Sequence, residues 1–415
     1  MQNTINMKKH TFILLAIILS FSSCKKNGIL PDPKPINLTA KAKKLVKADN
    51  RFGFELLNRL ADTGYAENNF MISPLSISQA LSMAYNGAAG STKTAFDNTM
   101  HFDGMSLQDI NQSQKELVSA LLPVDPKVAL TIANSVWYSN SLQIKDEFVQ
   151  RNETYYNSQV KALNFNSNAS VEKINNWVNE KTNGKITEIV KTLNPLDRLV
   201  LINAIYFKGN WRNKFHEEET APGEFYTEDG EKIIVDMMKT TGDFVYYENV
   251  IFNLLEMPYG RKNFSMVVLL PKEGYRVSDI MDSLSAENWQ KWLNESYPVE
   301  DVPVVFPKFK FSYEQSLVKV LKELGLETAF NKTNADFSGI NEYEQLFISN
   351  VLHKTFIKVD ETGTEAAAAT SVVFGTTSVG PGNPFVADHP FVFIIKEKYT
   401  QAILFSGVLS NPNQE

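Results

Sequence analysis

The stretch Glu361-Thr-Gly-Thr-Glu-Ala-Ala-Ala-Ala-Thr370 consists largely of small residues and lies between two segments with the composition of buried strands, Leu352–Val359 and Phe391–Lys396. Alanine and threonine suit a segment that slides between neighbouring strands, because a close-packed interior does not accept bulky or charged side chains. A short surface helix is the alternative, since Thr362 and Glu365 have the spacing of a capping box and alanine is the best helix former. The rest of the chain must decide between the two.

The N-terminus has the features of an export signal. A basic start at Met7-Lys8-Lys9-His10 precedes an apolar run over Thr11–Phe21, which is too short to span a bilayer as a permanent helix. Cys24 follows and is the only cysteine, so no disulfide can form within one chain. Its position resembles the lipobox of bacterial lipoproteins, which predicts a lipid on Cys24. The alternative is an unpaired cysteine inside a discarded signal peptide.

We expect three parts: a signal peptide over residues 1–23, a lipid-anchored tether over 24–40 and a folded domain over 41–415. The tether contains three prolines and no apolar periodicity, which is typical of a semi-rigid spacer. Lys25, rather than an aspartate, follows Cys24. This favours display from the outer membrane of a bacterial envelope.

Composition excludes several classes of partner and activity. The chain has 43% hydrophobic residues and a net charge of −6, which is ordinary for a globular protein and argues against a nucleic-acid partner. No nucleotide-binding loop or hydrolase elbow occurs, and no metal-ligand spacing is present among the histidines, which are His10, His101, His216, His353 and His389. We therefore expect no metal, no cofactor and no enzymatic activity. A hydrolase built from distant residues would leave no such signature and stays as an alternative.

Periodicity predicts a mostly helical first half and a strand-rich second half. The expected helices are Ala42–Asp62, a helix opened by Ser73-Pro74, Leu107–Leu122, Lys145–Asn157, Ser170–Thr182, Val277–Leu293 and Glu314–Leu324. The expected strands are Val128–Tyr138, Leu199–Phe207, Lys232–Met238, Phe244–Tyr247, Phe252–Met257, Phe264–Leu270, Leu346–Val359, Phe391–Lys396 and Gln401–Leu409. This irregular order predicts an α+β fold with large mixed sheets.

Six separated motifs resemble those of the serpins, and they occur in the family's order between about Lys41 and the C-terminus. They are Asn69–Ile77, Leu201–Trp211, Phe306–Lys308, Ala335–Ile340, Glu361–Thr370 and Ala387–Phe391. The resemblance implies an α+β serpin fold with three β-sheets, about eight or nine helices and an exposed reactive loop. It also implies a monomer.

The resemblance assigns roles to particular positions. One is the shutter, a hydrogen-bonded cluster that holds the central strands of the main sheet together. It would contain Ser73, Ser76, Asn203 and His353. The breach, where strand insertion begins, would contain Trp211 and Lys308, with Lys308 paired to Glu361. The hinge would contain Glu361, Gly363, Thr364, Glu365, Ala366, Ala367, Ala368, Ala369 and Thr370.

The implied mechanism is suicide inhibition. A serine protease would attack the reactive loop within Gly363–Asn383 and form an acyl-enzyme. The freed hinge would then insert into the main sheet as a new strand. Insertion would carry the bound protease across the molecule and distort its active site. The inward face of that new strand would be Thr364, Ala366, Ala368 and Thr370, which alternate as strand geometry requires. None of them is proline or a large charged residue, so we expect an inhibitory member.

Loop composition limits the target. No lysine or arginine lies between Thr362 and Lys396, so the loop offers no basic side chain to the acidic primary pocket of a trypsin-like protease. The family's register places the scissile bond between Thr377 and Ser378, which suits an elastase-like or subtilisin-like serine protease. The loop is slightly longer than in many relatives, so other residues before the bond stay open, namely Val373, Phe374, Thr376 and Val379. If Phe374 precedes the scissile bond, the loop would instead suit chymotrypsin-like proteases.

Two further expectations concern binding. The family's glycosaminoglycan-binding helix matches Met105–Leu122, where Lys115 is the only basic residue, so no heparin-type cofactor is expected. The alternative to inhibition is a serpin-fold ligand carrier or chaperone whose loop is cut without trapping a protease. The partners expected are therefore serine proteases and, through the lipid, a membrane.

Overall fold

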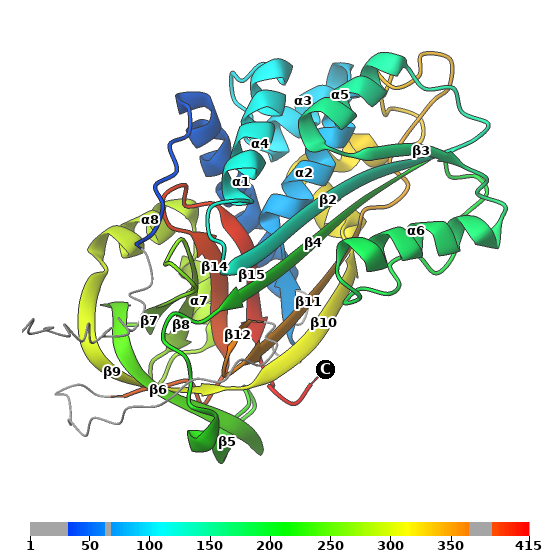
Figure 1. Cartoon of the computed structure of the whole chain (residues 1–415). Helices are drawn as coiled ribbons and strands as arrows, with labels where there is room; N and C mark the ends of the chain where they lie inside the picture. Colours follow the sequence, from blue (N-terminus) through cyan, green and yellow to red (C-terminus); the bar gives the residue numbers. More distant parts are fainter. Residues whose placement is uncertain (1–31, 63–67, 365–383, 415) are drawn as a thin grey trace, which may run out of the picture. The chain divides into compact units, whose positions relative to one another are not determined.

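The computed structural model describes residues 32–62, 68–364 and 384–414. Figure 1 shows helices packed around mixed sheets, as an α+β fold requires. The α-helices of this part are α1 (Ala40–Ala61), α2 (Pro74–Tyr85), α3 (Gly90–Thr99), α4 (Leu107–Leu121), α5 (Asp146–Tyr156), α6 (Asn168–Lys181), α7 (Val277–Ser283), α8 (Ala286–Glu295) and α9 (Val318–Leu321). Its strands are β1 (Phe70–Ile72), β2 (Val128–Ser139), β3 (Gln159–Leu163), β4 (Leu199–Asn210), β5 (Ala221–Tyr226), β6 (Lys232–Glu248), β7 (Phe252–Pro258), β8 (Phe264–Pro271), β9 (Tyr297–Pro307), β10 (Phe309–Ser316), β11 (Leu352–Asp360), β12 (Gly363–Thr364), β13 (Phe385–Val386), β14 (Phe391–Glu397) and β15 (Ile403–Leu409).

In the described part of the chain, the main sheet has six strands in the order β10-β11-β12-β4-β2-β3. Alternation along β2 and β4 sends their side chains to two separate cores. Val136 and Leu201 join the core beneath α2, whereas Trp137 and Ile202 join a second core with Trp177 of α6. The sheet is thus covered on both faces along part of its length, with α6 in front in Figure 1.

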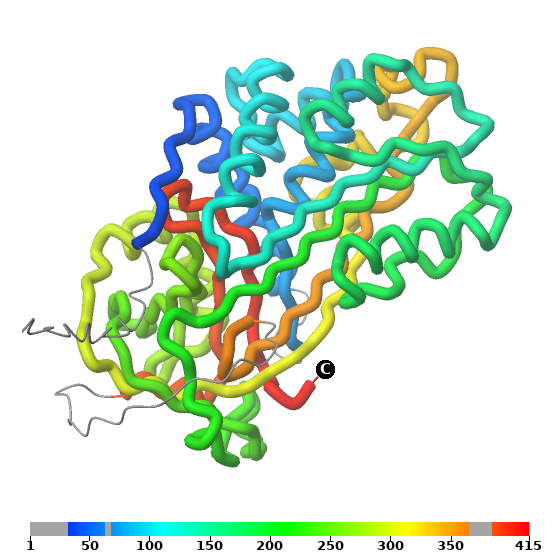
Figure 2. Tube along the Cα trace, viewed as in Figure 1, coloured from blue at the N-terminus to red at the C-terminus, as the bar shows by residue number. Residues whose placement is uncertain are grey.

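The second sheet follows the path β1-β15-β14-β8-β7-β6-β9-β13, with β5 beside β6. The short β1 from the N-terminal half pairs with β15 near the C-terminus, as Figure 2 shows in blue and red. The long strands β6 and β9 continue past β7 to join β5 and β13, so the smaller strand group is continuous with this sheet. Strands β8, β14 and β15 are buried throughout, because they are covered on both faces.

The structure corrects several expected elements. The helix predicted over Glu314–Leu324 is wrong in its first part, because β10 runs to Ser316 and pairs with β11. The helix predicted over Val277–Leu293 is two helices, since Ser285 caps α8 with its side chain. The two strands predicted between Lys232 and Tyr247 are the single strand β6. Helix α3 was not predicted, because its apolar residues are few.

Part of the predicted tether is bound to the folded body. The Lys34 N–H donates to the Asn263 side-chain oxygen at 2.8 Å, and the Asn263 amide donates back to the Lys34 carbonyl at 2.8 Å. Leu38 is buried and Thr39 caps α1. The folded unit therefore includes residues from Asp32 onward. None of the helices in the described ranges is both long and apolar enough to cross a membrane.

Candidate functional site

The beginning of the predicted hinge is a strand inside the main sheet. Thr364 pairs with Val359 of β11 on one side and with Gly209 of β4 on the other. Gly363 pairs with Asp360 and Asn210 in the same way. These two hinge residues therefore already occupy the position between β11 and β4, and the helical alternative is excluded for them (Figure 1).

Close contact with β4 explains the residue types at this point. A Cβ atom added to Gly363 would lie 2.1 Å from the Gly209 carbonyl oxygen, so only glycine fits there. Thr364 is 3% exposed, and its hydroxyl lies 2.6 Å from the Tyr259 hydroxyl. The first residue of the predicted inserting face is therefore buried and hydrogen-bonded.

The predicted breach residue Trp211 holds the turn before the hinge. Its indole N–H donates to the Asp360 carbonyl at 2.9 Å, and its backbone N–H donates to the Thr362 carbonyl at 2.9 Å. The indole ring stacks on Tyr259 with a centroid distance of 4.4 Å and an interplanar angle of 13°. Trp211 therefore contacts the turn before the hinge, and Tyr259 contacts both Trp211 and the hinge residue Thr364.

The predicted pair of Lys308 and Glu361 is present, with 3.1 Å between the ammonium and a carboxylate oxygen. Glu361 also accepts a hydrogen bond from the Thr220 hydroxyl at 2.8 Å. Burial alone would raise the pKa of Glu361, but hydrogen bonds from its own backbone, Thr220 and Lys308 lower it below its ordinary value. The carboxylate is therefore charged at neutral pH and fixes the start of the loop.

Beyond β12, no continuous hydrogen-bonded ladder joins β4 and β11 in the described residues, and we call this unpaired interval the gap. Between β4 and β11 in the described chain, direct pairing is confined to the isolated bridge of Leu201 and Val351 at the opposite end of the strands. A small cavity beside Thr364 is lined by Met71, Phe207, Phe356, Ile357, Ile395 and Phe405. A strand that extends β12 into this gap must bury its inward side chains among these apolar residues, so small residues fit there.

The four shutter residues predicted from the resemblance are all buried, and within the described ranges their hydrogen bonds form two separate groups. The Ser73 N–H donates to His353 Nε2 at 3.1 Å, and the Ser73 hydroxyl accepts from the Ser76 N–H at 3.2 Å. Burial lowers the pKa of His353 to about 3, in agreement with a neutral ring whose Nε2 accepts. Asn203 instead donates to the side chain of Asn134 on β2.

Asn134 connects the sheet to a buried polar network that the sequence did not reveal. Its amide donates to Gln79 at 2.8 Å, and the Gln79 amide donates to Gln114 on α4 at 3.3 Å. The Gln114 amide contacts Ser78 at 3.1 Å and Asp49 of α1 at 3.4 Å. Burial raises the pKa of Asp49 to about 7, although hydrogen bonds from Ser78 and Gln114 oppose the shift.

Several predicted positions lie outside the described residues. These are the lipidation residue Cys24, the scissile pair Thr377 and Ser378, and the hinge residues Glu365, Ala366, Ala367, Ala368, Ala369 and Thr370. Residues 32–62, 68–364 and 384–414 contain no group of His, Cys, Asp and Glu side chains arranged to hold a metal ion.

The geometry defines a sheet with a loop-derived strand entering between two of its central strands. The model of the family described as "Serpin (serine protease inhibitor)" matches residues 47–412, so the chain belongs to the serpin family. An uncharacterized serpin-like protein of Thermococcus kodakarensis is 38% identical, with 89% of this chain and 86% of that protein covered. The leukocyte elastase inhibitor of Bos taurus is 36% identical, with 89% and 99% covered.

Solved structures confirm the predicted serpin fold. The native state of tengpin, a thermophilic serpin, matches with a TM-score of 0.82 and 30% identity over 92% of this chain and 97% of that one. Human thyroxine-binding globulin complexed with thyroxine matches with a TM-score of 0.82 and 29% identity, over 91% of this chain and 100% of that one. The fold is therefore shared with a thermophilic serpin and with a thyroxine-binding globulin.

Proposed function

We propose that this chain is an irreversible suicide-substrate inhibitor of serine proteases. The observation that carries the proposal is the position of β12, whose Gly363 and Thr364 pair with both β11 and β4. Insertion after cleavage would extend a strand that has already begun, so it needs no new nucleation step. The relatives that include elastase inhibitors support the same reading.

The residues ahead of the inserted pair support trapping rather than simple cleavage. The small cavity beside Thr364 is lined mainly by apolar side chains, and the next inward residues by alternation are Ala366, Ala368 and Thr370. Small side chains lower the barrier to insertion, because they do not require β4 and β11 to separate widely. Fast insertion traps the acyl-enzyme before water hydrolyses it.

We propose a target with a small or apolar primary pocket. The loop lacks lysine and arginine, and the family's register puts Thr377 before the scissile bond and Ser378 after it. Elastase-like and subtilisin-like enzymes fit these residues, and chymotrypsin-like enzymes fit if Phe374 occupies the pocket.

Incubation with elastase tests the proposal, since trapping gives a covalent complex that survives boiling in SDS. Mass spectrometry of the released C-terminal fragment then identifies the scissile bond. The variant Thr364→Arg places a charged side chain at a position that is 3% exposed and should convert the inhibitor into a cleaved substrate. The matched control Thr362→Arg changes a half-buried residue before the strand and should retain trapping. Cleavage of the unmodified chain without any complex would refute inhibition.

We further propose that the protein is a bacterial lipoprotein held at the outer membrane through Cys24. The basic start, the apolar run and the single cysteine support this location. Mass spectrometry of the membrane-extracted protein should find a diacylglycerol-modified Cys24 as the first residue. A chain whose Cys24 carries no lipid would contradict it.

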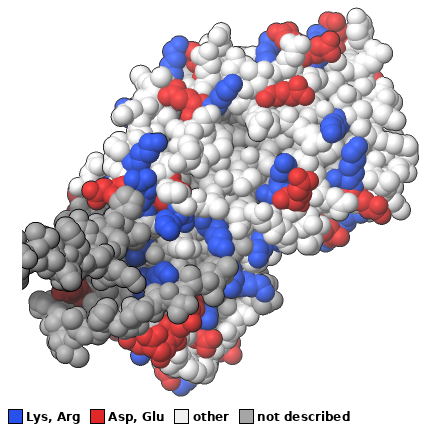
Figure 3. Space-filling view, viewed as in Figure 1, with Lys and Arg blue, Asp and Glu red and all other residues white. Residues whose placement is uncertain are grey.

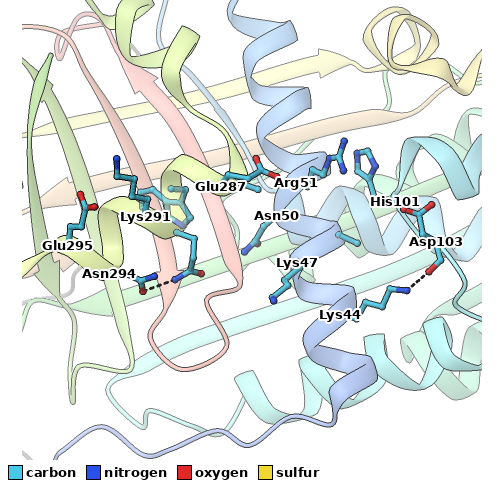
Figure 4. Close-up of a pocket in the computed structure, with 14 residues that line it drawn as sticks. Lys44, Lys47, Asn50, Arg51, His101, Asp103, Glu287, Lys291, Asn294 and Glu295 are labelled. Carbon is cyan, nitrogen blue, oxygen red and sulfur yellow. Dashed lines mark hydrogen bonds between the residues drawn. The ribbon is translucent and has the colours of Figure 1, made fainter. Parts of the chain in front are cut away.

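A second candidate function is the carriage of a small ligand, and one pocket favours it. A cavity of about 710 Å³ lies between α1 and α8, with Lys44, Lys47 and Arg51 on one side and Lys291 on the other (Figure 4). Trp289 contributes an apolar surface. Asp103, Glu287 and Glu295 also line the cavity, so the four cations leave a small excess of positive charge that suits an aromatic carboxylate, and a related structure contains bound thyroxine.

Binding of an anionic aromatic dye such as anilinonaphthalene sulfonate tests the second candidate. Lys47→Gln should weaken binding, because it removes a cation from the pocket wall. Lys43→Gln is the matched control, since Lys43 is an exposed lysine of the same helix that does not line the pocket. Equal binding by both variants would remove the pocket from consideration.

A further inference from the structure

A basic patch surrounds the turn between β7 and β8. It consists of Lys127, Lys208, Arg212, Arg261 and Lys262. The Arg212 guanidinium donates to the Gly260 carbonyl at 3.4 Å, and a Cβ atom on Gly260 would lie 2.8 Å from Cβ of Lys127. Lys208 lies opposite Ala129 on the outward face of β4. Figure 3 shows lysine and arginine side chains gathered over the start of β2 and the end of β4.

The patch is a local excess of positive charge in a chain whose net charge is −6. Within the described ranges, no ion pair joins Lys127, Lys208, Arg261 or Lys262 to a carboxylate. Asp125 lies among them, but it is 1% exposed and accepts the backbone N–H groups of Lys127 and Arg261. Its side chain therefore holds the two loops together beneath the patch.

The chain toward Cys24 leaves the folded body at this patch. The Arg261 guanidinium donates to the Asp32 carbonyl at 3.0 Å, and Lys34 is hydrogen-bonded to Asn263. Asp32 follows Cys24 by eight positions in the sequence, and a fully extended chain of eight steps spans about 29 Å. A lipid on Cys24 would therefore keep the patch within about 29 Å of the headgroups, and Lys25 and Lys26 would add charge along the way.

We propose that this patch docks on an anionic lipid surface and acts as a second membrane contact beside the lipid anchor. The inference rests on the proposed anchoring through Cys24, because the anchor brings the patch to the bilayer. The lipid on Cys24 would hold the chain at the bilayer, and each lysine or arginine close to an anionic lipid surface would add about 1 kcal/mol of attraction. Tyr259 adjoins the patch and contacts the hinge, so docking would turn the hinge end of the main sheet toward the bilayer.

Vesicle binding tests the proposal without depending on lipidation. The probe is the chain from residue 24 carrying Cys24→Ser, which retains all described residues, mixed with phosphatidylglycerol-containing or neutral phosphatidylcholine vesicles. We expect binding to the anionic vesicles at about 0.1 M salt and its loss at about 1 M salt, where the Debye length falls to about 3 Å. The triple variant K127Q/K208Q/K262Q should bind on the order of 100-fold more weakly, at about fivefold per removed cation.

The matched control is K161Q/K173Q/K319Q, which removes three exposed lysines outside the patch and gives the same net charge. It should bind like the parent. Equal losses in both triple variants, or equal binding to neutral vesicles, would overturn the proposal. Retention on a heparin column without vesicle binding would also overturn it and assign the patch to a soluble polyanion. Because the probe carries no lipid, a failure here is distinct from a failure of the anchor, which the mass of Cys24 decides.

Discussion

Replacing His353 with glutamine should change how stability depends on pH. His353 is 3% exposed, and its Nε2 accepts the Ser73 N–H at 3.1 Å. A glutamine side-chain oxygen can accept the same bond but does not titrate. The variant therefore removes the protonation equilibrium while it retains the buried hydrogen bond.

The magnitude follows from the pKa of the ring. Burial lowers the pKa of His353 from 6.5 to about 3, so the native state binds this proton less readily than the unfolded chain does. Its contribution to the free energy of unfolding is present above pH 6.5 and is lost as the pH falls from 6.5 toward 3. At about 1.4 kcal/mol per pH unit, the loss is about 3 kcal/mol by about pH 4.5.

Asp49 acts in the opposite direction. Burial raises its pKa from 3.8 to about 7, so the native state retains this proton while the unfolded chain releases it. The contribution is present below pH 3.8 and is lost as the pH rises toward 7. Acidification from pH 6.5 to about 4.5 thus gains about 3 kcal/mol from Asp49 and loses about 3 kcal/mol from His353. The two groups cancel in the parent protein.

The assay is urea unfolding followed by tryptophan fluorescence between about pH 4.5 and 6.5, with all comparisons made against the parent at each pH. On acidification, His353→Gln should become more stable relative to the parent by about 3 kcal/mol, and Asp49→Asn less stable by a similar amount. The double variant should follow the parent. Parallel curves for the parent and His353→Gln would refute the reasoning, because they would mean that the ring titrates alike in both states.

Three further predictions concern the hinge and the core. Gly363→Ala should expel the hinge from the sheet, because its Cβ would lie 2.1 Å from the Gly209 carbonyl, and faster proteolysis before residue 365 would report it. Tyr259→Phe removes the 2.6 Å contact with the hinge threonine, costs about 1 kcal/mol and should speed amide exchange of that threonine; unchanged exchange would contradict this. Lys396→Met leaves the carboxylate of Glu256, now 3.0 Å from the lysine, buried without its partner, and should cost about 3–5 kcal/mol in urea unfolding, with the addition of Glu256→Gln recovering most of the loss.

Secondary structure was predictable where the local pattern and the tertiary environment agree. Helix α4 and strand β2 match their predicted positions closely, because their apolar periodicity is the same as their burial pattern. Strand β10 was predicted as a helix from Glu314 onward, and pairing with β11 overrides that propensity. The helix α3 buries few side chains and so left no clear periodic signal.

The sequence by itself determined the chemistry of the loop: the small alternating residues from Thr364 to Thr370, the absence of lysine and arginine, and the order of the serpin motifs. These properties depend on residue identity and order along the chain, so the sequence alone is enough to establish them. Only the tertiary structure decided that Gly363 and Thr364 are already inserted, that Asn203 reaches Asp49 through a buried network, and that separate basic residues form one patch. Each of these depends on contacts between segments far apart in the chain, and a local pattern does not specify them.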